Sequence, residues 1–129
     1  MRADELMIGD WVQDDLGKPI QVRELLEYGI NGEWGGPELL DVEAYYEDIE
    51  PIPITRGSLL YNGFHYYGVG LVREEIYVRS MDSNDDEWLV EYTSKDKTIG
   101  EVKKLSYVHE LQNFLRSTDR YIDYQMPRV

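Results

Sequence analysis

The sequence contains no cysteine, few basic residues and no long apolar run, and each shortage excludes a class of protein. Without cysteine, neither a disulfide scaffold nor a thiolate zinc site can form. The apolar runs are only a few residues long, so no segment is expected to cross a membrane. The first residues, 1–5, lack the apolar stretch of a signal peptide, which predicts a cytoplasmic protein.

Basic residues number 13 against 26 acidic ones, which gives a net charge of −13. Because phosphate attraction supplies most of the affinity for nucleic acids, direct nucleic-acid binding is disfavoured. Binding to anionic membrane surfaces is disfavoured for the same reason. The acidity is concentrated in residues 1–64, which hold 14 acidic and 4 basic residues, whereas residues 65–129 hold 12 and 9. A solubilising surface explains this charge, and attraction of a basic partner is the alternative.

The length of 129 residues and the share of hydrophobic residues, 42%, predict one globular domain over 1–129, with 119–129 as a C-terminal tail. Tyrosine is unusually frequent, with 11 tyrosines against 2 phenylalanines. Tyrosine suits half-exposed positions on strands, because its ring is apolar and its hydroxyl is polar. The same property suits a protein-binding surface.

Alternation of apolar and polar residues predicts most of the chain to be antiparallel sheet. A strand is expected at 11–13 and a longer one over 20–30, followed by a hairpin turn at Asn31-Gly32. Short breaks between the alternating segments of 64–102 predict a meander, because crossover helices need longer connections. Within it, Gly68 and Gly70 are interpreted as marking a bulge or a close approach of backbones.

Two helices are expected. Thr55 is a suitable N-cap, and Ile54 and Leu59 are spaced for a hydrophobic staple across the first turn. Gly63 ends this short helix, and Phe64 after it can contact Leu59, so Leu59 is predicted to be buried. The predicted fold class is therefore α+β, mostly antiparallel sheet, with this capped helix and a C-terminal amphipathic helix.

The C-terminal helix is predicted from Ser106, as N-cap, to about Thr118, with an apolar stripe along one side. Four polar residues recur at i, i+3, i+4 and i+7 on another side: His109, Gln112, Asn113 and Arg116. Such side chains can donate and accept hydrogen bonds at one surface, as a partner would require. A solvated helix face is the plainer interpretation.

A second candidate surface lies between residues 38 and 50, where six acidic residues occur and no basic one. The residues expected to form this surface are Asp41, Glu43, Tyr45, Tyr46, Glu47 and Asp48. The carboxylates would steer a basic partner, and the two tyrosines would supply apolar contact. A solvated acidic loop is the alternative.

The sequence gives little support for catalysis, metal binding or a cofactor. The acidic loop 82–86 resembles the start of an EF-hand, but Glu87 stands where glycine is required and Thr93 where a bidentate glutamate is required. The two histidines, His65 and His109, lie in no metal-binding motif, and no serine lies in a nucleophile elbow. We therefore expect a protein that is not an enzyme, with no metal and no cofactor.

Three blocks of sequence resemble a family. The segments Pro51-Ile52-Pro53-Ile54-Thr55, Leu59-Leu60-x-x-Gly63-Phe64 and 107–113 (YVHELQN) resemble uncharacterised proteins of Bacteroides-type bacteria and their phages or prophages. Glu110 and the segment 56–58 depart from that family's pattern. The resemblance implies a mobile-element setting and draws attention to the His109–Asn113 face, without implying an activity. In addition, the segment 6–12 resembles the opening of SH3-like barrels.

Together these features predict a small, acidic, phage-related protein that binds another macromolecule without catalysing a reaction. Its partner is expected to be a protein, and a basic one fits the charge. One alternative is a decoy that mimics DNA and inhibits a host DNA-binding defence protein, which requires carboxylates spaced like phosphates. The other is an enzyme whose site is assembled in space and carries no recognisable motif.

Overall fold

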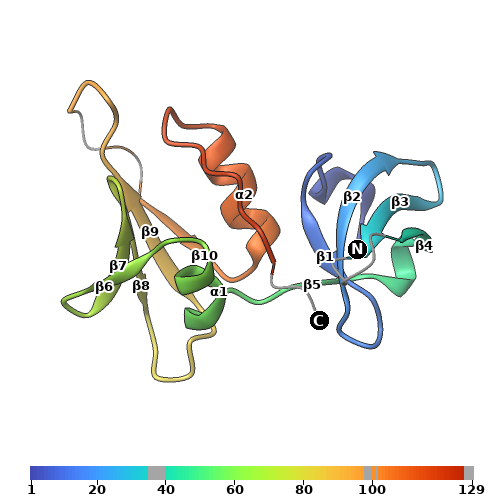
Figure 1. The fold of residues 1–129 in the computed structure, drawn as a ribbon, viewed down its shortest axis with the longest axis horizontal. Helices are drawn as coiled ribbons and strands as arrows, with labels where there is room; N and C mark the ends of the chain where they lie inside the picture. Colours follow the sequence, from blue (N-terminus) through green and yellow to red (C-terminus); the bar gives the residue numbers. More distant parts are fainter. Residues whose placement is uncertain (35–39, 98–99, 101, 127–129) are drawn as a thin grey trace. The chain divides into compact units, whose positions relative to one another are not determined.

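The structure is a computed structural model that describes residues 1–34, 40–97, 100 and 102–126 (Figure 1). It divides into two compact units: unit 1 holds Met1–Ile52 together with Met126, and unit 2 holds Pro53–Gln125. Each unit contains one five-stranded sheet. The sequence predicted one domain, whereas the chain forms two units that each enclose their own buried apolar side chains.

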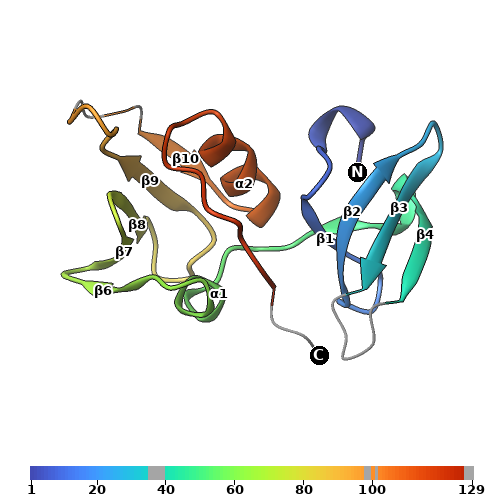
Figure 2. The ribbon, with the colours of Figure 1, turned by 45° about the horizontal axis from the view of Figure 1, so that its top comes forward.

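Unit 1 is an antiparallel sheet with the strand order β4-β3-β2-β1-β5 (Figure 2). Its strands are β1 (Trp11–Gln13), β2 (Pro19–Leu25), β3 (Gly29–Trp34), β4 (Asp41–Tyr45) and β5 (Glu50–Pro51). Residues of β1, β2 and β3 turn inward and form an apolar cluster together with Leu6 and Ile49, which lie outside the strands; its strand members are Val12, Ile20, Val22 and Ile30. The strand order is compatible with the SH3-like arrangement, which stays a prediction.

The predicted hairpin turn at Asn31-Gly32 is wrong. Both residues lie within β3, where Asn31 pairs with Glu24 and Gly32 with Val22, and the turn falls earlier, between β2 and β3. The register shifts between Val22 and Glu24, as at a β-bulge. A Cβ atom at position 32 would lie 2.5 Å from the backbone oxygen of Gln21. The glycine is therefore needed for close packing of two backbones, a requirement that looks like a turn in the sequence.

Two short 3₁₀ turns complete unit 1: η1 (Ala3–Glu5) and η2 (Tyr46–Asp48). The residue before the first of them is Arg2, whose backbone N–H donates to the Glu5 carboxylate at 2.8 Å. The second turn leads into Ile49, which belongs to the apolar cluster.

Unit 2 contains the predicted meander, with the strand order β10-β9-β8-β7-β6 (Figure 1). The strands are β6 (His65–Tyr67), β7 (Gly70–Arg73), β8 (Ile76–Ser80), β9 (Trp88–Tyr92) and β10 (Lys103–Leu105). Gly68 opens the turn between β6 and β7 with a φ of 59°, as a two-residue hairpin loop requires. A Cβ at Gly70 would lie 2.6 Å from the backbone oxygen of Val78, so the predicted close approach is confirmed there.

The short helix α1 (Arg56–Tyr61) begins and ends as the sequence predicted. The Ser58 N–H donates to Thr55 Oγ1 at 3.1 Å, which satisfies one of the first backbone donors. At the other end, the N–H of Phe64 donates to the Leu59 carbonyl and that of Gly63, with a φ of 84°, to the Leu60 carbonyl. This is a Schellman motif. Leu59 is completely buried, as expected.

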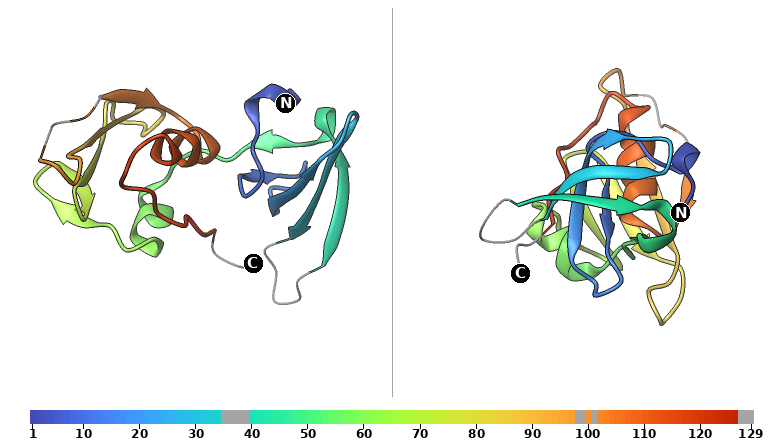
Figure 3. Two further views of the ribbon diagram at one scale, coloured as in Figure 1. Left: turned by 90° about the horizontal axis from the view of Figure 1, so that it is seen from above. Right: turned by 90° about the vertical axis from the view of Figure 1, so that its right-hand side faces the viewer.

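The helix α2 (Val108–Arg116) covers one face of the sheet of unit 2 (Figures 2 and 3). Its buried apolar residues are Val108, Leu111, Phe114 and Leu115. It begins later than expected, since Ser106 is not the N-cap. The Glu110 carboxylate instead accepts the backbone N–H groups of Ser106 and Tyr107, each at 3.0 Å.

The segment after α2 was expected to be a tail, but its residues up to Gln125 belong to unit 2. Ile122 and Tyr124 are buried, and the Tyr124 hydroxyl lies 2.7 Å from Ser58 Oγ. The side chain of Asn62 accepts the Gln125 N–H at 2.6 Å and donates to its carbonyl at 2.7 Å. The rest of the expected tail, 127–129, lies outside the described residues.

The fold class is α+β with mostly antiparallel sheet, as the sequence predicted. In the part of the chain that the structure describes, no helix has the length and apolar character needed to cross a membrane.

Candidate functional site

The polar stripe predicted on the C-terminal helix is only partly available for a ligand. His109 and Gln112 are buried, and Asn113 and Arg116 are half-buried. Arg116 donates to the Asn113 side chain and lies over the ring of Tyr121, 5.8 Å from its centre. Part of the hydrogen-bonding capacity of these four residues is thus used within unit 2, and their role in binding stays a prediction.

The predicted acidic surface lies on β4 and η2 of unit 1. Asp41, Glu43 and Tyr45 alternate along β4 and are exposed, which places them on one face of that strand. The Tyr28 hydroxyl donates to Glu43 at 3.0 Å, and this carboxylate raises the pKa of Tyr28. The Tyr28 and Tyr45 rings lie 5.8 Å apart.

The other members of that surface differ in role. Glu47 and Asp48 are exposed. Tyr46 is half-buried, and its hydroxyl donates to the Leu26 carbonyl, so it holds the β2–β3 turn in place. The neighbouring hollow, of about 510 Å³, is lined by Arg23 as well as by Asp41 and Glu43. A basic side chain of the protein itself therefore shares this hollow with the two carboxylates, and it pairs with Glu33 at 3.2 Å.

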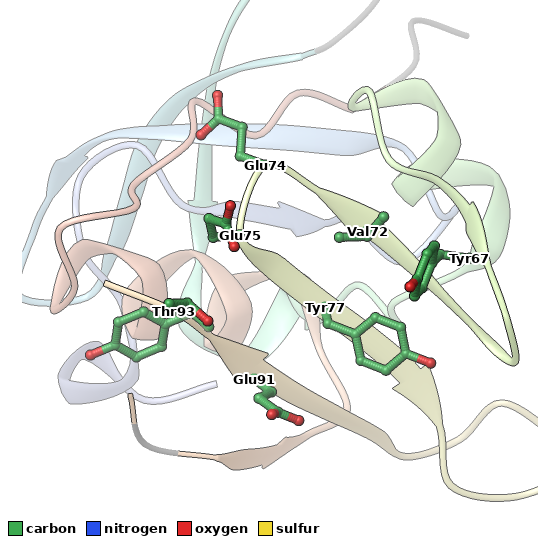
Figure 4. A pocket seen from close by; sticks show the side chains of 8 residues that line it. Tyr67, Val72, Glu74, Glu75, Tyr77, Glu91 and Thr93 are labelled. Atoms are coloured by element: carbon green, nitrogen blue, oxygen red, sulfur yellow. The ribbon is translucent and has the colours of Figure 1, made fainter. Parts of the chain in front are cut away.

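A more distinctive site lies on the sheet of unit 2, on the face opposite α2. Along β7, β8 and β9 the residues Leu71, Val78 and Val90 are buried toward α2, so their neighbours turn to the opposite face. There, Val72 pairs with Tyr77, and Tyr77 pairs with Glu91. In this face a pocket of about 280 Å³ opens (Figure 4). We name it the β7–β9 pocket; it is lined by Tyr67, Val72, Glu74, Glu75, Tyr77, Glu91, Tyr92 and Thr93.

Two tyrosines form the apolar wall of the β7–β9 pocket. The rings of Tyr67 and Tyr77 meet edge to face, with their centres 6.4 Å apart and their planes at 89°. A Cβ atom at Gly70 would lie 2.9 Å from the Tyr77 ring, so the ring rests on backbone that carries no side chain. Tyr92 differs, because its ring lies edge-on to Phe114 of α2, 5.8 Å away.

The polar part of the pocket consists of three glutamates. Glu74, with a φ of 55°, and Glu75 form the turn between β7 and β8, and Glu91 lies opposite Tyr77 on β9. The Glu75 carbonyl accepts the Thr93 N–H at 2.9 Å, which brings Thr93 beside this turn. Within residues 1–34, 40–97, 100 and 102–126, none of the three carboxylates makes an ion pair.

The acidic loop after β8 is occupied by contacts within the protein. Arg56 donates to both carboxylate oxygens of Asp85, at 2.9 and 3.1 Å, and this pairing lowers the pKa of Asp85. The Asp82 carboxylate accepts the backbone N–H groups of Asn84 and Asp86. Among the described residues, no group of three or more histidines or carboxylates is arranged to hold a metal ion.

Sequence reasoning missed the β7–β9 pocket, because its residues come from four strands whose register the sequence does not state. One signal was present: the two-residue turn Glu74-Glu75 sets Arg73 opposite Ile76, and hence Val72 opposite Tyr77. The position of Glu91 depends on the longer loop before β9 and could not be read in this way.

Comparison of this chain with protein-family models, with curated proteins and with solved structures finds no match. The resemblance to phage and prophage proteins therefore stays a prediction, and the site is interpreted from its own geometry.

Proposed function

We propose that the protein is a non-enzymatic interaction protein, and that it binds a basic segment of a partner protein through the β7–β9 pocket. The observation that carries this proposal is the composition of the pocket: three glutamates beside two tyrosine rings, with no basic residue among the described residues that line it. Carboxylates attract a cation, and the rings supply apolar contact and a negative π-face for it.

The location of the pocket suits a macromolecular partner. It lies on the face of the unit 2 sheet opposite α2, and no helix in the described part of that unit covers this face (Figure 3). Around it, Tyr67 and Val69 are strongly exposed, at 68% and 78%. Aromatic residues that are exposed beside a concave site are typical of protein interfaces.

The setting of this interaction is part of the proposal. A chain with a net charge of −13 repels nucleic acids and anionic membranes, which favours a basic protein as partner in the cytoplasm. The resemblance noted above would set that interaction in the biology of phages or other mobile elements.

The alternative, a decoy that mimics DNA, would use the acidic surface of unit 1. It is favoured by the exposure of Asp41, Glu43, Glu47 and Asp48, which lie close in sequence on β4 and η2. The pairing of Glu43 with Tyr28 and the presence of Arg23 in the adjoining hollow weaken it, because phosphates of DNA have no such partners.

A pair of variants with equal changes in charge separates the two proposals. The pocket variant, E74Q/E75Q/E91Q, and the control variant, D41N/E47Q/D48N, each lose three negative charges and keep nearly the same side-chain shapes. Both are tested by fluorescence anisotropy with a labelled 12-residue peptide that contains four lysines and four arginines, at low and high salt.

We expect the wild type to bind this peptide, the pocket variant to bind at least about tenfold more weakly, and the control variant to bind within about twofold of the wild type. Equal losses in both variants would mean that only net charge matters, and would overturn the proposal. A loss confined to the control variant would transfer the site to unit 1 and favour the decoy.

A further inference from the structure

We infer that the β7–β9 pocket is an arginine pocket, which receives one guanidinium group of the partner. This inference rests on the proposed function and makes it more specific, because it names the side chain that is recognised and distinguishes it from lysine. It is argued from the size of the pocket, its hydrogen-bonding groups, its aromatic wall and the placement of the protein's own cations.

The size of the pocket suits a single side chain. Its volume of about 280 Å³ lies just below the roughly 300–1,000 Å³ of sites that enclose small molecules. The pocket is open to the surface rather than enclosed, so a side chain can enter while its backbone remains outside.

The hydrogen-bonding groups of the pocket are mainly acceptors. The carboxylates of Glu74, Glu75 and Glu91 accept only, and the hydroxyls of Thr93 and the tyrosines can accept as well. A guanidinium group carries five N–H donors in a planar fork and binds carboxylates in a bidentate manner. An ammonium group has three donors and is more strongly hydrated, so it loses more on leaving water.

The aromatic wall provides a surface for a planar cation. The rings of Tyr67 and Tyr77, which meet edge to face, supply this surface, and Glu91 is the cross-strand neighbour of Tyr77. Arginine stacks on such faces and can bind a carboxylate with its edge at the same time. In the described residues the protein's own cations lie over other rings, those of Trp34, Trp88 and Tyr121, and none lies over Tyr67 or Tyr77.

Two basic side chains of unit 2, Arg73 and Arg120, bind backbone carbonyls rather than the carboxylates of the pocket. Arg73 donates to the Asn62 carbonyl at 2.6 Å, and Arg120 donates to the carbonyls of Thr93 and Ser94. Arg79 pairs with Leu89, so it lies on the same face but farther along β8, beyond Tyr77. On this face Arg79 is thus two residues along β8 from Tyr77 and, among the described residues, makes no ion pair with a carboxylate of the pocket.

The test uses four peptides of identical sequence except at one position, which is arginine, lysine, citrulline or glutamine, and follows backbone amide shifts by NMR during titration. Citrulline has nearly the shape of arginine without its charge. We expect saturable shifts at Val72, Tyr77 and Glu91, with arginine bound about fivefold more tightly than lysine and at least tenfold more tightly than citrulline.

Two variants of the ring test the stacking. Tyr77→Leu should weaken binding of the arginine peptide at least fivefold and remove its advantage over lysine, whereas Tyr77→Phe should keep that advantage, because the ring remains. Tyr61→Leu, at an exposed tyrosine of α1, is the matched control and should change neither value.

The outcomes distinguish this inference from the proposed function. If arginine and lysine peptides bind equally and both are lost in E74Q/E75Q/E91Q, the arginine pocket is wrong and the proposed binding of a basic segment stands. If no basic peptide shifts the pocket amides of the wild type, both are wrong. Equal binding of citrulline and arginine would also overturn the inference, because charge would then have no part.

Discussion

The two units enclose their apolar side chains in different ways, and the difference decides where a binding site can form. In unit 1 the cluster around Val12, Ile20 and Ile30 is surrounded by its own strands and by partly buried residues such as Trp34 and Tyr46. In unit 2 the sheet buries one face against α2, and the opposite face keeps half-buried residues such as Tyr77. A sheet covered by a helix on one side alone keeps a second face for a partner.

The largest effect is expected at Leu59, where the contacts at the two ends of α1 meet. Leu59→Ala should lower the free energy of unfolding by about 2–4 kcal/mol, because Leu59 is fully buried between both ends of α1. Native-state hydrogen exchange measures this at the Leu71 and Val78 amides.

The adjacent Leu60 is 43% exposed, and Leu60→Ala is the control, with a loss under about 0.5 kcal/mol. If the units are energetically distinct, the amide of Val22 in unit 1 keeps its protection in Leu59→Ala. If Leu59→Ala lowered the protection of the Val22 amide as much as that of the unit 2 amides, the two sheets would unfold together and the units would not be energetically distinct.

In unit 1 the corresponding test is Gly32→Ala. The added methyl would lie 2.5 Å from the Gln21 oxygen and 2.7 Å from Ile20 Cγ2, so we expect a destabilisation of about 1–3 kcal/mol in denaturant unfolding. Gly57→Ala in α1 is the counterpart: its methyl has open space, with Thr55 Oγ1 3.9 Å away, and should stabilise unit 2 by about 0.4–1 kcal/mol. If the two substitutions changed the free energy of unfolding in the same direction, the close contact assigned to Gly32 and the open space assigned to Gly57 would both be contradicted.

A smaller effect should appear at high pH in unit 2. Burial raises the pKa of Tyr124 to about 12, so the folded state keeps its hydroxyl proton when the unfolded state has lost it. The associated stability is present below pH 10 and is lost as the pH rises through about 12. At pH 11 the wild type should have lost about 1 kcal/mol relative to pH 9 from this group.

Tyr124→Phe removes the titrating group, so the difference in unfolding free energy between pH 9 and pH 11 should shrink by that amount. The Ser58–Tyr124 hydrogen bond disappears too, which lowers stability at neutral pH by about 1 kcal/mol. An unchanged pH dependence would show that Tyr124 is hydrated and that the C-terminal segment is not packed as described.

The smallest effect concerns the pair of Arg56 and Asp85, which connects α1 with the loop before β9. Arg56 lowers the pKa of Asp85. The stability that this pair contributes is therefore present above the ordinary pKa of a carboxyl group, and it is lost as the pH falls through the lowered pKa of Asp85. Asp85→Asn keeps the φ of 57°, which asparagine tolerates, and should cost less than about 1 kcal/mol at pH 7.

Denaturant unfolding at pH 7 and at pH 3 checks this prediction. The difference in the free energy of unfolding between the wild type and Asp85→Asn should be smaller at pH 3 than at pH 7. Glu87→Gln, whose pair with Lys104 is longer at 3.5 Å and more exposed, is the control and should have no measurable effect. A larger loss at Glu87 than at Asp85 would contradict the assigned geometry.

The sequence predicted those parts of the fold that depend on neighbouring residues. Thr55 and Gly63 determine the ends of α1 through contacts within a few residues, and the structure has both. The same local logic failed at Asn31-Gly32, because the packing of Gly32 on Gln21 depends on a partner strand with a bulge. A glycine needed for close contact and a glycine needed for a turn look alike in a sequence.

The candidate site was harder to predict for a related reason. Tyr67, Tyr77 and Glu91 are ordinary strand residues, and they form a pocket only once β6 to β9 are aligned. The candidates chosen from composition, around Glu43 and His109, were conspicuous in sequence, yet parts of both are engaged within the protein: Glu43 accepts from Tyr28, and His109 is buried. Register, which arises from long-range pairing, is the missing information.

The bonds between Asn62 and Gln125 have a consequence for synthesis on the ribosome. They join residues 63 positions apart, so this part of unit 2 cannot form until residue 125 has left the exit tunnel. The sheet of unit 1 needs nothing beyond Pro51 and can pair much earlier. During translation, then, the bonds between Asn62 and the C-terminal segment form last, and nascent chains would acquire their strand pairing in unit 1 well before unit 2 is complete.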